Sequence, residues 1–294
     1  CLNLFQGVVM ATEQSSLQIN KEEIPFIFEK STLLPIASLQ LIFAGHGAIA
    51  DGKKAGLAKI TSSLLNEGTK SLGATAFAKQ LDAKAIEIYS SNGRETFVIT
   101  VESLKSEFPL AIKYLNDLLK EPNFTQESLD KVKTKMIGAL KQKESDFDYL
   151  ANISLMQTLF KDTPIASPNS GTIESIKTIT FEDVTHFLKE SLTLANCMVV
   201  MGGDLEIKDA KTFVSSILSP LAQGTKTINS FYHANSEKKE IISHKSTEQT
   251  YLYFGAPIFT TNSDEDSYKA KVAAFILGSS GFGSRLMEEI RVKR

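Results

Sequence analysis

Apolar and polar residues alternate along two stretches near the start of the chain, residues 24–29 and 36–43. Alternation with a period of two is typical of a β-strand that turns one face to the core. A second pair of alternating stretches, residues 85–90 and 95–101, is separated by a Ser-Asn-Gly-Arg run at 91–94, which favours a tight hairpin turn. The pattern therefore predicts two pairs of strands in the first third of the chain.

Longer segments carry apolar residues at three- and four-residue spacing, which indicates helices with one buried face. Residues 57–65 follow this spacing, and Gly68 comes after them as a C-terminal stop. Thr125 is the expected N-cap of the longest helix, and Thr180 with Asp183 forms a capping-box pattern. The predicted helices cover residues 57–65, 74–81, 104–119, 128–144, 150–160, 181–190 and 207–218.

Composition changes after the last of these helices. Residues 219–237 contain Pro220, Gly224 and many Ser, Thr and Asn residues without a sustained period, which is typical of an interdomain linker. The predicted elements beyond it are strands at 240–244 and 249–257, a helix at 264–277, a glycine-rich turn at 278–284 and a helix at 285–291. Strands again precede helices, so a repeat is expected. The predicted domains are 12–218, the linker 219–237, and the truncated start of a second, homologous domain at 238–294.

Residues 1–11 are apolar and end in Val-Met-Ala ahead of the polar residues 12–16. They resemble the remnant of a secretory signal peptide cleaved after Ala11, which predicts a periplasmic or secreted protein; the alternative is an ordinary N-terminal arm on a cytoplasmic protein. The chain begins without Met and stops within a helical pattern at Arg294, so we expect a fragment. The two cysteines exclude a disulfide framework, and Cys197, in an apolar run, is expected to be a buried thiol.

The charge balance argues against nucleic acid as a partner, because 32 basic and 34 acidic residues give a net charge of −2 and a pI near 6.2. No apolar run approaches the roughly twenty residues that span a bilayer, so no transmembrane segment is predicted. The four histidines are scattered through four different predicted elements. The sequence therefore offers no pair of His residues close together on one element as metal ligands.

The helix predicted at 57–65 lies within a Gly-Leu-Ala-…-Leu-Leu-…-Gly-Thr frame at residues 56–69. This frame resembles the helix that carries the inverted zinc motif, His-x-x-Glu-His, in the insulinase/pitrilysin (inverzincin) family of zinc peptidases. In that motif two imidazoles bind zinc and the carboxylate activates the attacking water. The first His falls at Lys59, the Glu at Ser62 and the second His at Ser63. None of these three side chains can take over the role of the residue it replaces.

The resemblance continues along the chain. The helix at 128–144 resembles the family helix that brings a glutamate to the zinc as third ligand, and the match places that ligand at Ala139. Residues 171–184 follow the family's G-x-x-E-x-I-x-x-I-T-x-x-D-V run. The Ser-Arg-Leu-x-x-x-Ile-Arg run that ends at Arg291 resembles one in the second half of the family, and it matches Arg291 to an arginine that contacts the substrate backbone. The alternative for Arg291 is a solvated arginine at a helix end.

This resemblance covers residues from about 24 to 294 and implies an α+β fold of two homologous domains, each a mainly antiparallel sheet with helices on one face. It implies a catalytically inactive member, or a non-catalytic subunit, of the processing-peptidase-like branch. Such a chain would help to bind peptide for an active partner in a heterodimer, and zinc is expected in the partner and not here. Two alternatives remain open: an active zinc metalloendopeptidase with displaced ligands, and a structural protein that holds peptide without cutting it.

Overall fold

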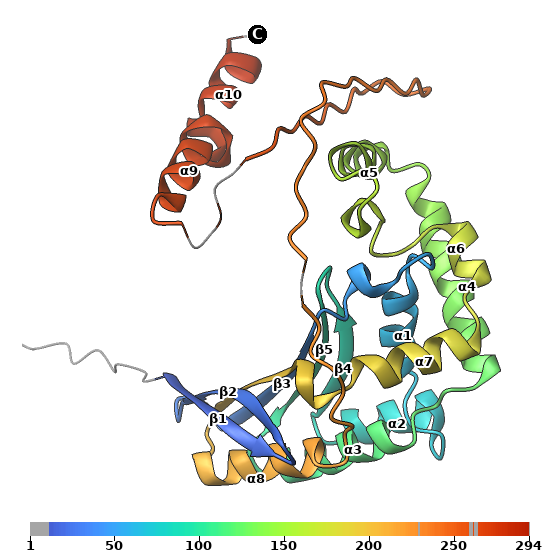
Figure 1. Cartoon of the computed structure of the whole chain (residues 1–294), viewed down its shortest axis with the longest axis vertical. Coiled ribbons are helices and arrows are strands. Elements are labelled where there is room, and N and C mark those ends of the chain that lie inside the picture. The colour runs from blue at the N-terminus through green and yellow to red at the C-terminus, as the bar shows by residue number, and fades with distance from the viewer. Residues whose placement is uncertain (1–11, 229, 259–260, 262–263, 294) are drawn as a thin grey trace, which may run out of the picture.

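Six β-strands form one mixed sheet in the computed structural model, which describes residues 12–228, 230–258, 261 and 264–293. The strands are β1 (Thr12–Ile19), β2 (Glu22–Lys30), β3 (Ile36–Ala44), β4 (Glu87–Asn92), β5 (Thr96–Leu104) and β6 (Cys197–Gly203). Their order across the sheet is β1-β2-β6-β3-β5-β4. Strands β2 and β6 pair in parallel, and the other pairings among these six strands are antiparallel. Strand β6 thus separates β2 from β3, which are neighbours in sequence (Figure 1).

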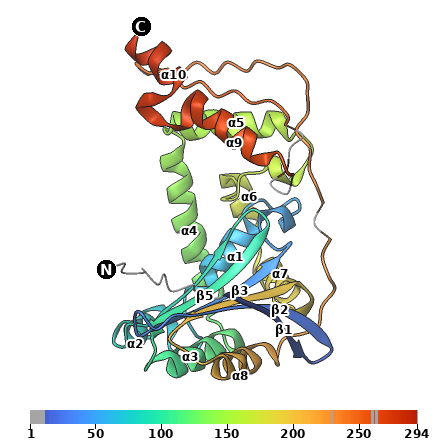
Figure 2. The same cartoon turned by 90° about the vertical axis from the view of Figure 1, so that its left-hand side faces the viewer.

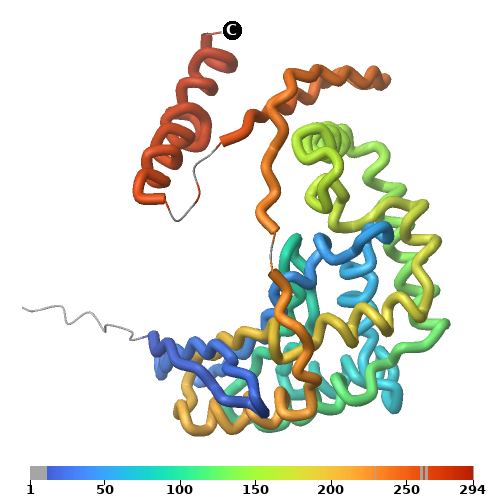
Figure 3. Tube along the Cα trace, viewed as in Figure 1, coloured from blue at the N-terminus to red at the C-terminus, as the bar shows by residue number. Residues whose placement is uncertain are grey.

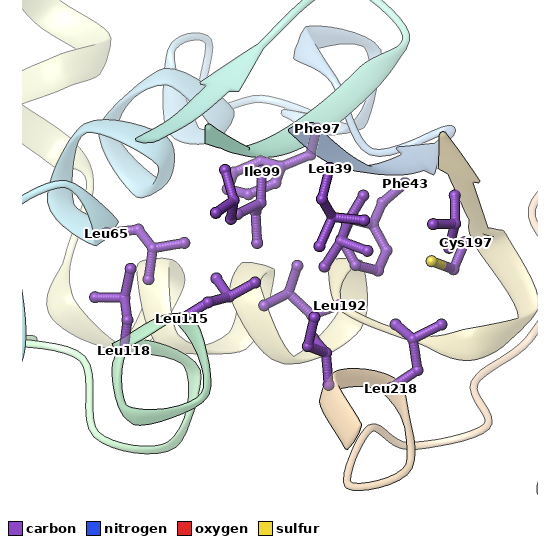
Figure 4. Close-up of a cluster of buried hydrophobic side chains, with 14 of the residues drawn as sticks. Leu39, Phe43, Leu65, Phe97, Ile99, Leu115, Leu118, Leu192, Cys197 and Leu218 are labelled. Atoms are coloured by element: carbon purple, nitrogen blue, oxygen red, sulfur yellow. The ribbon is translucent and has the colours of Figure 1, made fainter. Parts of the chain in front are cut away.

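One face of the sheet is turned into the core by alternating side chains. In β3 the four odd-numbered residues from 37 to 43 are buried, and the residues between them are exposed or half-buried. Figure 4 shows Leu39 and Phe43 of β3, with Phe97 and Ile99 of β5, on the side of the sheet that faces the helices. Full burial of such a side chain stabilises a protein by about 1.5–3 kcal/mol, so this face holds the helices against the sheet.

Eight α-helices lie between the end of β3 and residue 218. They are α1 (Leu57–Leu65), α2 (Gly73–Asp82), α3 (Phe108–Lys120), α4 (Gln126–Lys143), α5 (Phe147–Leu159), α6 (Ile173–Thr178), α7 (Phe181–Ser191) and α8 (Ile207–Leu218). Helix α3 starts four residues later than predicted, because Leu104 is the last residue of β5 and a proline occupies the first turn of the helix. The predicted N-cap Thr125 is confirmed by a 3.1 Å bond from the Ser128 amide, and the capping box of Thr180 is also confirmed.

Strand β1 is the element that the sequence pattern missed. Its first five residues are polar, and within it Leu17 and Ile19 are the buried positions, so alternation is too short to signal a strand. Its conformation follows from pairing with β2 along the whole strand, from Thr12 opposite Glu29 to Ile19 opposite Glu22. The backbone partner, and not the side-chain pattern, makes this segment a strand.

The runs at 240–244 and 249–257 were predicted as strands, and this prediction is wrong for the structure described. Both runs form no β-ladder with any described residue. An alternating side-chain pattern selects a face, but a strand also needs a neighbouring strand for its N–H and C=O groups. Tyr251, Leu252 and Phe254, which would have formed alternating faces, are exposed instead.

The predicted linker has two parts that behave differently. Residues 219–227 bond to the sheet domain: the Leu194 amide donates to the Ala222 carbonyl (2.9 Å), and the Thr227 amide donates to Asn196 Oδ1 (2.7 Å). From Ile228, which is 90% exposed, the chain leaves the domain and rises to the level of α5 (Figure 3). There it passes along α5, with the Asn235 amide donating to the Leu159 carbonyl at 2.8 Å.

Helices α9 (Ser267–Ala274) and α10 (Arg285–Met287) lie beyond this extended segment, away from the sheet in both Figure 1 and Figure 2. In the described parts of the chain, no helix combines the length and the apolar character that a membrane span requires. The predicted α+β class is confirmed, with a mainly antiparallel sheet covered by helices. The division into two domains stays a prediction, and the signal-peptide remnant at residues 1–11 lies outside the described residues.

Candidate functional site

Helix α1 begins at a loop that is fixed by a buried acid. Asp51 is 5% exposed, and its two carboxylate oxygens accept the backbone N–H groups of Gly56 and Ala58, each at 2.7 Å. The first N–H groups of a helix have no partner within the helix, so Asp51 satisfies donors that would otherwise be buried without a bond. Gly56 has a φ of +93°, and a Cβ there would lie 2.7 Å from the Ile176 side chain, so the position requires glycine.

The three motif positions on α1 differ in exposure. Lys59 is exposed, Ser63 one turn later is half-buried, and Ser62 is 1% exposed. The Ser62 hydroxyl bonds to the Lys59 carbonyl oxygen at 3.0 Å and lies 3.3 Å from Asn92 Oδ1 at the end of β4. The position that carries the water-activating acid in the zinc motif is therefore occupied here by a small hydroxyl, and that hydroxyl is engaged with its own helix and with β4.

Helix α4 runs beside α1 in the opposite direction (Figure 2). Its register is set by Glu67, just beyond α1, which accepts bonds from Lys131 Nζ (2.5 Å) and Lys135 Nζ (3.3 Å). Glu67 lies about two helical turns after Lys59, and Ala139 lies about two turns after Lys131. Because the two helices are antiparallel and meet at Glu67 and Lys131, Ala139 is expected at the level of Lys59. The predicted third-ligand position therefore lies on the helix that packs against α1.

The charges that join these helices are well satisfied. Burial opposes ionisation of Glu67, but the bonds and charges of Lys131 and Lys135 outweigh it and hold the pKa of this carboxyl below its ordinary value. A third lysine of α4, Lys133, donates to the carbonyl oxygens of Lys177 and Ile179 at the end of α6, at 2.9 and 2.7 Å. The lysines of α4 therefore dock this helix onto α1 and α6. None of these contacts brings an acid to the end of α4 that carries Ala139.

The chemistry available at this site is not that of a zinc ligand set. Lys59 offers an ammonium, Ser63 a neutral hydroxyl and Ala139 a methyl group, and zinc in proteins is held by thiolate, imidazole and carboxylate. Over the described residues, no group of three or more His, Cys, Asp or Glu side chains has an arrangement suited to a metal ion. Cys197 is buried as predicted, and burial raises the pKa of its thiol to about 12, so it supplies no thiolate.

Arg291 lies far from this site within the chain. It is in the π-helical turn η6 (Glu288–Val292), it is exposed, and its guanidinium carbon lies 5.5 Å from the centre of the Phe282 ring. The segment around α10 is separate from α1 in both views (Figures 1 and 2). The structure therefore does not bring Arg291 next to Lys59, and its role as a substrate-binding residue stays a prediction.

Polar residues that sequence reasoning missed hold α1 against the edge strand. The Asn66 side chain accepts the Ser90 amide at 2.7 Å and donates to the Ser90 carbonyl at 2.9 Å, as a neighbouring strand would. The Ser90 hydroxyl also bonds to the Ser62 carbonyl at 2.6 Å. These contacts join residues more than twenty positions apart, and no local pattern signals them. Asp51, five residues before Gly56, could have been found from the sequence, because an acidic residue near the start of a helix stabilises that end.

Two family models match consecutive parts of the chain. Residues 28–173 match "Insulinase (Peptidase family M16)", and residues 178–294 match "Peptidase M16 inactive domain". A relative from Helicobacter pylori, the non-peptidase homolog YmxG, is 43% identical over 99% of this chain and 68% of its own length. The chain belongs to the insulinase (M16) family. The resemblance seen in the frame at residues 56–69 is thereby confirmed.

Solved structures of the insulinase family share the fold. The crystal structure of a peptidase M16 inactive domain from Pseudomonas fluorescens gives a TM-score of 0.81 at 25% identity, over 96% of this chain and 68% of that one. A protease from Helicobacter pylori gives a TM-score of 0.76 at 13% identity over the same shares. An uncharacterized zinc protease from Rickettsia bellii is 24% identical over 81% of this chain and 57% of its own length. The chain thus spans between about half and two thirds of such relatives.

Proposed function

We propose that this chain belongs to a catalytically inactive insulinase-family protein that binds peptide beside an active zinc peptidase of the same family. The observation that carries the proposal is the pairing of α1 with α4 through Glu67 and Lys131, on two helices whose motif positions carry Lys59, Ser63 and Ala139. A cation, a hydroxyl and a methyl group cannot hold zinc in that place. Two similar proteins, a non-peptidase homolog and a peptidase M16 inactive domain, support this proposal.

The proposal assigns zinc to the partner subunit, so that the partner cuts and this chain forms part of the peptide-binding cavity. The helix frame at residues 56–69 is present without its zinc ligands, and this supports the assignment of zinc to another subunit. A heterodimer in the periplasm or outside the cell fits the apolar start of the chain. Co-purification from native cells with a family member that carries the intact motif, followed by cell fractionation, tests the partner and the compartment.

Zinc content separates this proposal from an active metallopeptidase with displaced ligands. We expect the purified full-length protein to hold far less than one zinc per chain by elemental analysis, and to leave a fluorogenic peptide library uncut. The matched control restores the motif with Lys59→His, Ser62→Glu, Ser63→His and Ala139→Glu, and this variant should gain about one zinc, since α1 and α4 keep their register. One tightly bound zinc in the unaltered protein, together with peptide cleavage, would overturn the proposal.

A further inference from the structure

Lys59 is the point at which an otherwise enclosed helix reaches solvent. Of residues 57–65, all of which the structure describes, seven are buried, Ser63 is half-buried and Lys59 is exposed. A lysine on a helix with a broad solvated face is an ordinary surface charge. Here the packing of α1 on its other sides holds the start of the Lys59 side chain, so the ammonium emerges at a defined place.

Within the described part of the chain, the Lys59 ammonium forms no hydrogen bond or ion pair. The acids attached to α1 and its flanks are already engaged. Asp51 accepts the amides at the start of α1, Glu67 accepts two lysines of α4, and Asp183 pairs with Lys54 and caps α7. Burial opposes ionisation of Asp183, but Lys54 and the Thr180 groups outweigh it and hold the pKa of Asp183 below its ordinary value. These acids therefore remain with their present partners.

A second donor lies one turn from Lys59 on the same face of α1. Ser63 is four residues further along, and its hydroxyl has no hydrogen bond to the residues that the structure describes. On the facing helix, Ala139 is exposed and uncharged, and a Cβ added to the neighbouring Gly138 would meet nothing within 4 Å. Lys59 and Ser63 thus offer an ammonium and a hydroxyl that have no partner among the described residues, and position 139 of the facing helix carries no acid.

We infer that Lys59 and Ser63 bind a carboxylate group of a bound peptide, with one oxygen on the ammonium and the other on the hydroxyl. A carboxylate has two acceptor oxygens and one negative charge, which matches two donors and one uncompensated positive charge. The group comes from the C-terminus of the peptide or from an Asp or Glu side chain. This inference rests on the proposed function, because it names the class of peptide that the same site selects.

Three fluorescein-labelled octapeptides of one neutral sequence test the inference with the full-length protein. The first has a free C-terminal carboxylate, the second a C-terminal amide, and the third an amide with one central Glu. By fluorescence anisotropy, Lys59→Met should weaken binding of a carboxylate-bearing peptide roughly tenfold, and Ser63→Ala should weaken it several-fold. Neither variant should change binding of the neutral amide. The free-acid and Glu peptides distinguish the two sources of the carboxylate.

The matched control is Lys53→Met, which removes the same charge from an exposed, unpaired lysine six residues before Lys59. It should leave all three affinities unchanged, whereas a general loss of positive charge would weaken both lysine variants equally. Equal losses for the two variants, or equal affinity of the unaltered protein for the neutral amide and both acids, overturn the inference while peptide binding stands. If none of the three peptides binds, the inference and the peptide-binding part of the proposed function both fail.

Discussion

The buried acid at the start of α1 makes protein stability depend on pH in an unusual direction. Asp51→Asn keeps the shape of the side chain and one acceptor oxygen but removes its titration. The variant places an NH2 group against one of the two backbone donors, Gly56 or Ala58, which costs about 1–3 kcal/mol at every pH. The informative quantity is therefore how the stability difference between wild type and variant changes with pH, and not its absolute size.

The expected change follows from two opposing effects on one carboxyl. Burial raises the pKa of Asp51 from 3.8 to about 6, although the N–H groups of Ala58, Gly56 and Leu57 lower it. One pKa unit corresponds to about 1.4 kcal/mol, so the free energy involved is about 3 kcal/mol. Between the two pKa values the folded protein binds more protons than the unfolded chain, so stability falls as pH rises. The stabilising contribution of Asp51 is complete below about pH 4 and is lost above about pH 6.

The assay is urea unfolding of both proteins at half-unit steps from pH 4 to pH 7.5, with the variant as reference for all other titrating groups. The free energy of unfolding of the wild type should fall relative to the variant by about 3 kcal/mol across this range. A difference that grows with pH would refute the reasoning, because it would mean that the two short amide bonds favour the ionised carboxylate more than burial disfavours it. A flat difference would show that Asp51 has the same pKa in the folded and unfolded chains.

Three further predictions concern the ion pairs of Glu67, the predicted linker and Arg291. Glu67→Gln should lower the free energy of unfolding by about 1 kcal/mol at pH 7, since the partner lysines are half-exposed. The loss should shrink as pH falls below the ordinary pKa of 4.5, because the folded-state pKa of Glu67 is lower; a double-mutant cycle with Lys131→Met measures it. Limited proteolysis should cut first within residues 228–237 and spare 219–227, which are bonded to the sheet domain; mass spectrometry of the first fragments checks this. Arg291→Ala in the complete heteromer should lower the partner's kcat/KM roughly tenfold with assembly and zinc content unchanged, and a wild-type rate would make Arg291 a surface arginine.

The sequence by itself determined the elements whose signals are local. Helical spacing at 57–65, the capping residues Thr125 and Thr180, and the Asn-Gly step at 92–93 each act within a few residues, so they can be read without the fold. The family frame around Lys59 is equally local, because it lies on a single helix. Its departures from the zinc motif were therefore visible before any contact was known.

The tertiary structure alone decided what depends on neighbours. Strand β1 exists because β2 lies beside it, and the runs at 240–257 are not strands because no described segment does the same for them. The entry of β6 between β2 and β3 and the register of α1 against α4 join residues that are tens to more than a hundred positions apart. Hydrogen bonds and ion pairs of this kind form between whatever groups packing brings together. Side-chain periodicity shows which face of a helix or strand is buried, but it does not show which neighbouring element covers that face.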